Sequence, residues 1–293
     1  MIGNLLAERM AAYAPANALE QEHVLAELMQ QIVLAALAQA GFFAEAIFHG
    51  GTCLRLFFGM HRFSEDLDFM LVTPNATFAW APYLGAVRDH LLAEGIGFDV
   101  IERSQVDQAD QAIRKAFLKT DSLGQVLEFA LPFRRDSRRK IRIKLEVDTR
   151  PPPGSAVETA FLSFPITAGV TVQSLASAFG LKSHALLCRP YVKGRDWYDF
   201  LWFVDRGIVP DLALLEGAID QQGPWAGQGE TVDADWYLRV FRGRIEELDW
   251  VVARADVGRF LRAQEQSNLA QWGPELFLYQ LQRLSRLFGD VKI

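Results

Sequence analysis

Cysteine is scarce in this sequence, because the 293 residues contain only two, Cys53 and Cys188. Two cysteines in a chain of this length cannot form a disulfide framework, and no spacing of Cys and His matches a structural zinc site. We therefore expect a protein of the reducing cytoplasm.

Long apolar runs are also missing, since a glycine and two polar residues interrupt the most apolar stretch, 32–48. A membrane span needs about 20 mostly apolar residues, so we expect no membrane segment.

Two common catalytic signatures are absent as well. The sequence has no Gly-x-Ser-x-Gly motif, which would place a nucleophilic serine on a sharp turn. It also lacks the glycine-rich loop followed by Lys and Ser or Thr that holds phosphates in P-loop proteins. Acyl transfer of the serine-hydrolase type and P-loop hydrolysis are therefore disfavoured.

The chain has no overall excess of positive charge. Lys+Arg 30 against Asp+Glu 36 give a net charge of −6 and a pI of about 5.5, which argues against a protein that coats nucleic acid. One segment differs, because 134–144 (RRDSRRKIRIK) has seven basic residues and one acidic residue. We interpret it either as a solvated face or as a surface for the phosphates of a nucleic-acid acceptor. The residues assigned to that surface are Arg134, Arg135, Arg138, Arg139 and Lys140.

The apolar periodicity predicts an α+β fold, with a mixed β-sheet core flanked by helices and followed by a mainly helical C-terminal domain. Asn17 and Glu20 have capping-box spacing at the start of a helix over 17–40. The run AIFHGG predicts a strand and a tight turn, followed by a helix that ends at Gly59. Strands are expected at 66–72, 98–102, 125–131, 141–147 and 170–175, and further helices at 77–94, 112–118, 176–188, 195–204 and 271–288. A boundary near 172 would divide the chain into domains 1–172 and 173–293.

Asp66 and Asp68 form the first group of residues that could carry chemistry. On a strand, a spacing of two places both carboxylates on the same face. Two neighbouring carboxylates repel unless a cation lies between them, and Mg²⁺ prefers oxygen ligands such as carboxylates, phosphates and water. The pair therefore suits a site for metal and phosphate. The alternative is a pair of solvated carboxylates at the start of a strand.

The Gly50-Gly51-Thr52 turn lies between the predicted strand and helix, and Thr52 precedes Asp66 by 14 residues. Glycines at the start of a helix allow backbone N–H groups to approach an anion. The turn could therefore bind a triphosphate, or it could be a tight turn without a ligand.

The segment Ile141 to Asp148 alternates strictly between apolar and ionisable residues. Its polar face carries Lys144 and Glu146, and Glu146 could add a third carboxylate to a metal site for an in-line displacement. The alternative is an edge strand with an exposed charged face.

Basic and acidic residues recur on two predicted helices. Lys182 and Arg189 lie seven residues apart on the first helix, and Arg195, Asp196 and Asp199 follow on the second. Lysine and arginine at these positions could hold nucleotide phosphates. Surface ion pairs, such as one between Arg195 and Asp199, would produce the same pattern without any function.

Taken together, the segments FHGGTCLRLFFGMHRFSEDLDF, IKLEVDTR and LKSHALLCRPYVKGRDWYDFLWF resemble the AbiEii/AbiGii abortive-infection toxins, a family within the polymerase-β-like nucleotidyltransferase superfamily. The resemblance covers about 47–203. It implies that Asp66, Asp68 and Glu146 bind metal, and that these three residues together with Lys182 and Asp199 are catalytic. It also implies a nucleotide-binding set consisting of Gly50, Gly51, Thr52, Lys144, Lys182, Arg195 and Asp196.

The family resemblance implies a Mg²⁺-dependent transfer of a nucleotide from an NTP to an acceptor hydroxyl. The expected acceptor is a tRNA 3′ end, and the expected setting is a toxin–antitoxin or phage-defence pair with a cognate antitoxin. Two alternatives stay open. One is a nucleotidyltransferase that modifies a small molecule such as an antibiotic, and the other is a catalytically silent binding partner of an antitoxin.

Overall fold

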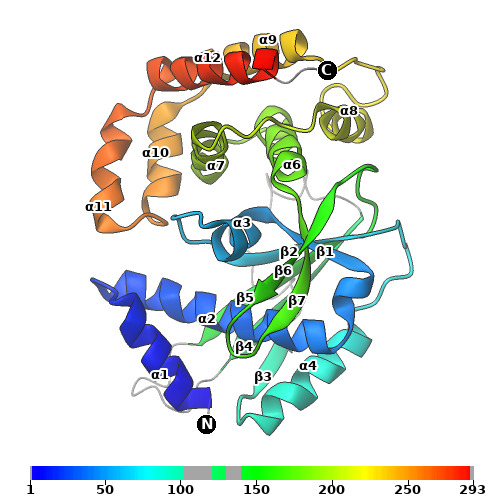
Figure 1. The fold of residues 1–293 in the computed structure, drawn as a ribbon, viewed down its shortest axis with the longest axis vertical. Coiled ribbons are helices and arrows are strands. Elements are labelled where there is room, and N and C mark those ends of the chain that lie inside the picture. Colours follow the sequence, from blue (N-terminus) through cyan, green and yellow to red (C-terminus); the bar gives the residue numbers. More distant parts are fainter. Residues whose placement is uncertain (1, 102–120, 130–139, 291–293) are drawn as a thin grey trace. The chain divides into compact units, whose positions relative to one another are not determined.

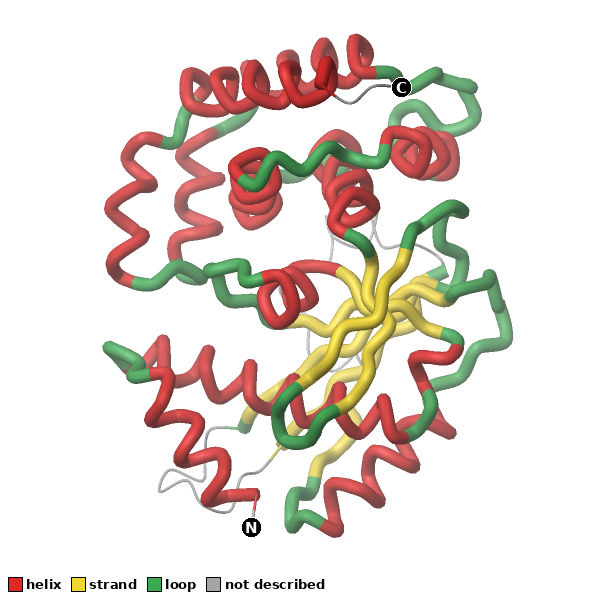
Figure 2. The backbone as a smooth tube through the Cα atoms, in the orientation of Figure 1, coloured by secondary structure: helices red, strands yellow, loops and turns green. Residues whose placement is uncertain are grey.

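The computed structural model of the chain describes residues 2–101, 121–129 and 140–290. It has the expected α+β fold, and the described strands form one seven-stranded sheet (Figure 1 and Figure 2). The chain divides into two compact units. The first, called the sheet unit below, comprises Met1–Gly59, Phe63–Pro151 and Val157–Val172. The second, called the helical unit, comprises Met60–Arg62, Pro152–Ala156 and Gln173–Ile293.

The sheet is mixed, with the strand order β3-β4-β5-β2-β1-β7-β6. Strand β1 is antiparallel to β2 and parallel to β7, and β2 is parallel to β5. Strands β3 and β4 continue the sheet beyond β5 in antiparallel pairs. The strands are β1 (Ala46–His49), β2 (Asp66–Leu71), β3 (Phe98–Ile101), β4 (Ser122–Phe129), β5 (Ile141–Asp148), β6 (Val157–Leu162) and β7 (Ala168–Gln173). This order places β2, with its two aspartates, between β5 and β1.

Strand β5 is an interior strand, paired with β4 on one side and β2 on the other. Its apolar residues Ile143, Leu145 and Val147 are completely buried, and α2 packs against the strand. The alternation in the sequence therefore predicts the strand correctly. The alternative of an edge strand is wrong, because β5 has a partner on both sides.

The described residues of the sheet unit form four helices, α1 (Ile2–Tyr13), α2 (Ala18–Gln39), α3 (Gly50–Phe58) and α4 (Ala81–Ala93), and a short 3₁₀ turn, η1 (Phe42–Ala44). The predicted cap of α2 is confirmed, because Oδ1 of Asn17 accepts a hydrogen bond of 2.9 Å from the backbone N–H of Glu20. Helix α3 ends at Gly59, whose φ of 75° is left-handed. Helix α4 begins at Ala81, four residues after the predicted start at Thr77, and has a proline in its first turn. Helix α1 and strand β6 are additions to the predicted set.

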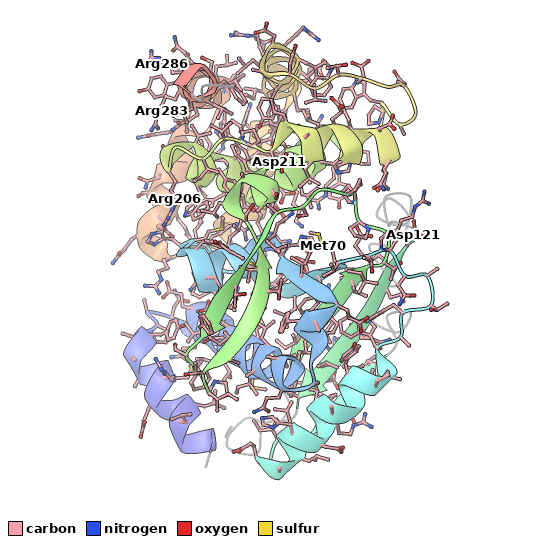
Figure 3. All side chains as sticks on the ribbon, turned by 45° about the vertical axis from the view of Figure 1, so that its right-hand side comes forward. Met70, Asp121, Arg206, Asp211, Arg283 and Arg286 are labelled. Carbon is pink, nitrogen blue, oxygen red and sulfur yellow. The ribbon has the colours of Figure 1, made fainter. Side chains whose placement is uncertain are left out.

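The helical unit contains α6 (Leu175–Cys188), α7 (Gly194–Asp205), α8 (Leu212–Gln221), α9 (Ala234–Glu247), α10 (Trp250–Gly258), α11 (Ala263–Gln266), η4 (Ser267–Gln271) and α12 (Pro274–Asp290). Asp211, labelled in Figure 3, caps α8 through the N–H of Leu214, and it also accepts a hydrogen bond of 3.1 Å from the hydroxyl of Ser177 on α6. Aromatic rings pack in the interior. The ring centroids of Trp197 in α7 and Phe277 in α12, for example, lie 5.4 Å apart. Across the described ranges, no helix combines the length and the apolar composition that crossing a membrane requires.

Candidate active site

The turn between β1 and α3 brings the start of a helix against β2. Gly50 has a φ of +80°, a left-handed conformation that residues with a side chain rarely adopt. A Cβ atom at Gly50 would overlap Oδ2 of Asp68 and would lie 3.1 Å from the Asp68 Cβ atom. Only glycine therefore allows the backbone of this turn to approach the Asp68 carboxylate so closely. The predicted strand, turn and helix are confirmed, and the helix begins at Gly50 itself.

Residues of three strands face the same side of the sheet beside this turn. In the parallel pair of β2 and β5, Asp66 lies opposite Lys144 and Asp68 lies opposite Glu146. On the other side of β2, His49 of β1 lies opposite Asp68. Residues in register on neighbouring strands share a face, and so do residues two apart on one strand. The structure thus places the three predicted metal ligands and Lys144 on one face, with His49 beside them.

The Asp66 carboxylate has an orphaned oxygen that fits a cation. Its Oδ1 atom is buried and has no hydrogen-bond partner in the part of the chain that the structure describes. A buried acceptor without a partner costs about 1–3 kcal/mol, and more when it is charged. Within the same residues, no group of three or more His, Cys, Asp or Glu side chains is arranged to hold a metal ion. Mg²⁺ needs only one or two protein carboxylates when phosphate and water complete its coordination, so Asp66 and Asp68 fit such an ion.

Thr52 links α3 to the strand that carries the aspartates. Its side chain is only 1% exposed, and its hydroxyl donates a hydrogen bond of 2.5 Å to the backbone carbonyl oxygen of Asp66. A threonine hydroxyl has a single hydrogen to donate. That donor is used here to hold the backbone of Asp66.

Most of the predicted surface for nucleic acid lies outside the described residues, namely Arg134, Arg135, Arg138 and Arg139. The predicted helix at 112–118 lies outside them too. Lys140 is described, and its Nζ atom lies 2.5 Å from Oε1 of Glu128, a carboxylate that also accepts a bond of 2.9 Å from Arg142. The hydrogen bond from Lys140 lowers the pKa of Glu128, so this pair stays charged.

In the helical unit, a cluster of buried charges joins α6 to α7. The Lys182 Nζ atom lies 2.8 Å from Oδ1 of Asp196 and 2.7 Å from Oδ2 of Asp199. Arg62 binds both oxygens of Asp199, with N–O distances of 2.6 and 2.7 Å. Asp199 is completely buried, so the alternative of an exposed surface pair at this residue is wrong.

Opposite charges set the protonation of this cluster. Burial alone would raise the pKa of Asp196, but Arg189, Lys182 and Lys193 hold it well below its usual range. Burial likewise opposes the charge of Lys182, yet Asp196 and Asp199 raise its pKa. The buried pair is therefore ionic at neutral pH.

Arg195 is held differently from Lys182. Its guanidinium group lies 4.1 Å from the centroid of the Phe260 ring, and its backbone N–H donates a bond of 3.3 Å to Asp256. The side chain thus stacks on an aromatic face, where guanidinium groups are stabilised by the ring electrons. Its expected contact with a nucleotide stays a prediction.

Two residues of the cluster were not among the candidates drawn from the sequence. Arg62 pairs with Asp199, which is 137 positions away, and a local sequence pattern does not predict so distant a partner. Lys193 precedes α7, and burial followed by the charge of Arg189 lowers its pKa to about 8. In the sequence, the indication for Lys193 is that it lies close to Lys182, Arg189 and Arg195. These basic residues outnumber the two aspartates of the cluster, Asp196 and Asp199.

Comparisons with known proteins identify the family to which this sequence is similar. A family model described as the nucleotidyl transferase AbiEii toxin of type IV toxin–antitoxin systems matches residues 32–276. No curated protein matches the sequence. Among solved structures, the nucleotidyltransferase toxin MenT4 from Mycobacterium tuberculosis is 19% identical, with a TM-score of 0.52, and the match covers 96% of this chain and 98% of that one. JHP933 from Helicobacter pylori is 19% identical, with a TM-score of 0.48 and coverage of 90% and 89%.

Proposed function

This chain belongs to the AbiEii nucleotidyl transferase toxin family of type IV toxin–antitoxin systems, and from that premise we propose how it transfers a nucleotide. The reaction is a Mg²⁺-dependent transfer from an NTP to an acceptor hydroxyl, on the sheet face that carries Asp66 and Asp68. The observation that supports this most directly is the buried, unpartnered Oδ1 of Asp66 beside the left-handed Gly50 turn. A carboxylate oxygen that nothing satisfies suits a cation that arrives with the substrate.

Each group of this face has a role in the proposed reaction. Asp66 and Asp68, with Glu146 in register, would hold Mg²⁺, which supplies charge that offsets the triphosphate oxygens. The turn at Gly50 and Gly51 offers backbone N–H groups at the start of α3 to the same oxygens. The acceptor hydroxyl releases its proton to water, its oxygen forms a bond to the α-phosphorus, the bond from that phosphorus to the β-phosphate oxygen breaks, and pyrophosphate leaves. Positioning and charge neutralisation provide the rate enhancement.

The remaining site residues have the following proposed roles. Lys144 shares the face with Asp66, so it can approach a phosphate bound there. For Lys182, Arg195 and Asp196 we propose nucleotide binding. Asp199, with both oxygens engaged by Arg62 and Lys182, fits a residue that orients these cations.

For the acceptor we propose a tRNA 3′ end, and for the protein partner a cognate antitoxin. The cluster of basic residues over 134–144 supports an acceptor rich in phosphate. The family description supports the antitoxin, because it places the toxin in a type IV system. NTP and tRNA are found together in the cytoplasm, so we propose that the reaction takes place there.

Asp66→Asn tests the proposal most directly. The change keeps the shape of the side chain and removes the charge that would hold the cation, so we expect the purified variant to fold but to lose transfer by at least 100-fold. The measurement is the transfer of label from each α-labelled NTP to total RNA in the presence of Mg²⁺, resolved on a gel. Asp89→Asn is the matched control, because Asp89 is an exposed aspartate of α4 in the same unit. Undiminished labelling by Asp66→Asn would reject the assignment.

The same assay separates the alternative functions. A labelled band of tRNA size supports the proposed acceptor, and charge reversal at Arg138 and Arg139 should then weaken labelling. Activity on small hydroxylated acceptors, with no effect of that reversal, would favour the enzyme that modifies a small molecule. An absence of Mg²⁺-dependent NTP binding by calorimetry would favour the silent partner of an antitoxin.

A further inference from the structure

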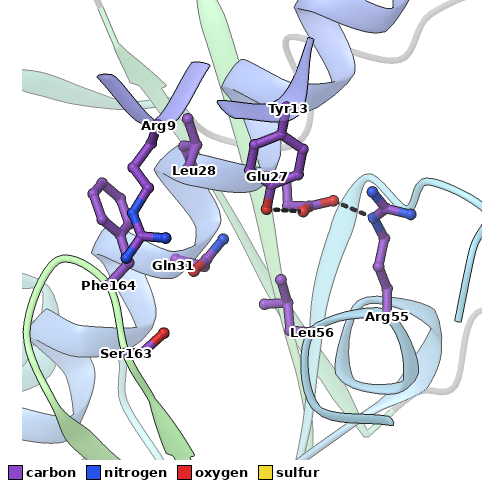
Figure 4. Close-up of a pocket in the computed structure, with 9 residues that line it drawn as sticks. All are labelled: Arg9, Tyr13, Glu27, Leu28, Gln31, Arg55, Leu56, Ser163 and Phe164. Carbon is purple, nitrogen blue, oxygen red and sulfur yellow. Dashed lines mark hydrogen bonds and ion pairs between the residues drawn. The ribbon is translucent and has the colours of Figure 1, made fainter. Parts of the chain in front are cut away.

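A cavity of about 220 Å³ lies in the sheet unit, away from the residues assigned to the transfer reaction. It is open to solvent and is lined by α1, α2, the last turn of α3 and the connection between β6 and β7 (Figure 4). Its lining residues are Arg9, Tyr13, Glu27, Leu28, Gln31, Arg55, Leu56, Ser163 and Phe164. At about 30 Å³ per water molecule, it has the volume of roughly seven waters. This is below the 300–1,000 Å³ typical of drug-sized ligands, so a ligand here would be small.

One wall of the cavity is a hydrogen-bonded chain that is already complete. The hydroxyl of Tyr13 donates a bond of 2.7 Å to one oxygen of Glu27, and the guanidinium of Arg55 binds the other oxygen (Figure 4). Burial and the Glu27 carboxylate raise the pKa of Tyr13 to about 12, so its phenol stays protonated. Both oxygens of Glu27 are thus occupied. The charge of Glu27 is matched by that of Arg55.

The positive charge of Arg9 is not neutralised by the Glu27 carboxylate, which is already paired with Arg55. Its guanidinium lies 5.4 Å from the centroid of the Phe164 ring, on the opposite side of the cavity from Arg55 in Figure 4. Among the described residues, no carboxylate forms an ion pair with Arg9. Two guanidinium groups against one carboxylate leave the lining with one net positive charge. The cavity therefore favours an anion.

The rest of the lining defines what the anion would be attached to. The accessible lining is mainly polar, because the Ser163 hydroxyl and the Gln31 amide offer hydrogen bonds, whereas Leu28 and Phe164 are only 1% and 2% exposed. We propose that this cavity binds a small molecule with one phosphate or carboxylate group on a compact polar body, and that Arg9 binds its anionic group. The charge pattern is common to both kinds of anion, so the experiment includes one of each.

The test is calorimetric titration of the full chain with glycerol 3-phosphate and, in a second arm, with glycerate. Both titrations contain neither NTP nor Mg²⁺, so their outcome is separate from that of the transfer assay. We expect binding of at least one compound, and a loss of affinity of at least tenfold in Arg9→Gln. Binding of glycerol 3-phosphate alone identifies a phosphate site, binding of glycerate alone identifies a carboxylate site, and binding of both identifies a site that recognises the charge.

Arg88→Gln is the matched control, because Arg88 also lies over an aromatic ring, that of Phe98, at 5.6 Å in the same unit. The affinity of Arg88→Gln for each titrated compound should equal that of the unchanged protein. A second variant, Ser163→Leu, keeps Arg9 but fills part of the cavity, and it should also weaken binding. Equal affinity in Arg9→Gln and Arg88→Gln, or no binding of either compound, would overturn the proposal.

Discussion

Thr52 shows how one hydroxyl can decide where a metal ligand lies. Its bond to the backbone carbonyl of Asp66 fixes the first residue of β2 against α3. Because the hydrogen is donated to the chain itself, we assign Thr52 a role in positioning Asp66. The motif in the sequence suggested a contact with phosphate at this position, and the two roles differ in what they predict for kinetics.

We expect Thr52→Val to lower kcat by about fivefold, since the loss of one hydrogen bond is worth about 1 kcal/mol, while the KM for NTP changes little. Thr52→Ser keeps the donor and should restore kcat. Steady-state kinetics of nucleotide transfer is the measurement. Thr171→Val is the control, because the Thr171 hydroxyl also donates to a backbone carbonyl, that of Phe43 at 3.0 Å, in the same unit. A selective rise in KM would instead favour the phosphate contact.

Local patterns made some site residues predictable and hid others. Asp66 and Asp68 are two residues apart on one strand, so their common face follows from the period of two. Their register with Glu146 depends on how β2 pairs with β5. The number of residues between the two strands does not predict that pairing. Arg62 was the hardest to predict, because its meaning depends entirely on the distant Asp199.

At the scale of elements, α7 depends on a close approach to α10 that only glycine allows. A Cβ atom at Gly194 would overlap the backbone carbonyl oxygen of Ala253 and would lie 3.2 Å from its Cα atom. Both clashing atoms belong to the backbone, so a rotamer change cannot relieve them. The start of α7 is where the buried Asp196 is placed.

Gly194→Ala should therefore destabilise the protein by about 1–3 kcal/mol, the usual cost of overpacking. Gly243→Ala in α9 is the control, since a Cβ atom there meets nothing within 4 Å. It should stabilise the fold by roughly 0.5–1 kcal/mol, because alanine favours a helix over glycine. Urea denaturation of both variants measures the two changes. If they shift stability in the same direction, the close approach is not the cause.

The elements that the sequence predicted best are those whose burial is periodic. Strand β5 has three completely buried residues on one face, and α2 has a capping residue and a buried side. Strand β6 escaped prediction because most of its side chains are exposed, as Phe161 is at 69%. Helix α4 begins late, since Asn75 forms a local turn in which its side chain bonds both the N–H and the hydroxyl of Thr77.

At the scale of the whole molecule, the buried charges of the helical unit make stability depend on pH. The pKa of Asp196 is well below its usual range in the folded state, so the folded protein binds fewer protons there than the unfolded chain does. By linkage, this carboxylate contributes its full stabilisation above about pH 4, the pKa of an unfolded aspartate. That stabilisation is lost as the pH falls toward the lowered pKa.

We expect the urea midpoint of the unchanged protein to fall as the pH is lowered below about 4. Asp196→Asn should be less stable at pH 7 by about 3–5 kcal/mol, because it leaves Lys182 and Arg189 buried without this partner. It should also lose part of the dependence on acid. Asp235→Asn, at an exposed position of α9, is the control for the change of charge. A variant with the full acid dependence of the unchanged protein would show that other carboxylates cause it.

Met60–Arg62 belongs to the helical unit although the sheet unit contains the residues on both sides of it. This arrangement matters while the chain is being synthesised. Arg62 leaves the ribosome 137 residues before Asp199, a delay of about 7 to 27 s at 5–20 residues per second. Throughout that interval the ion pair between Arg62 and Asp199 cannot form. Translation thus sets the earliest moment at which this ion pair can form.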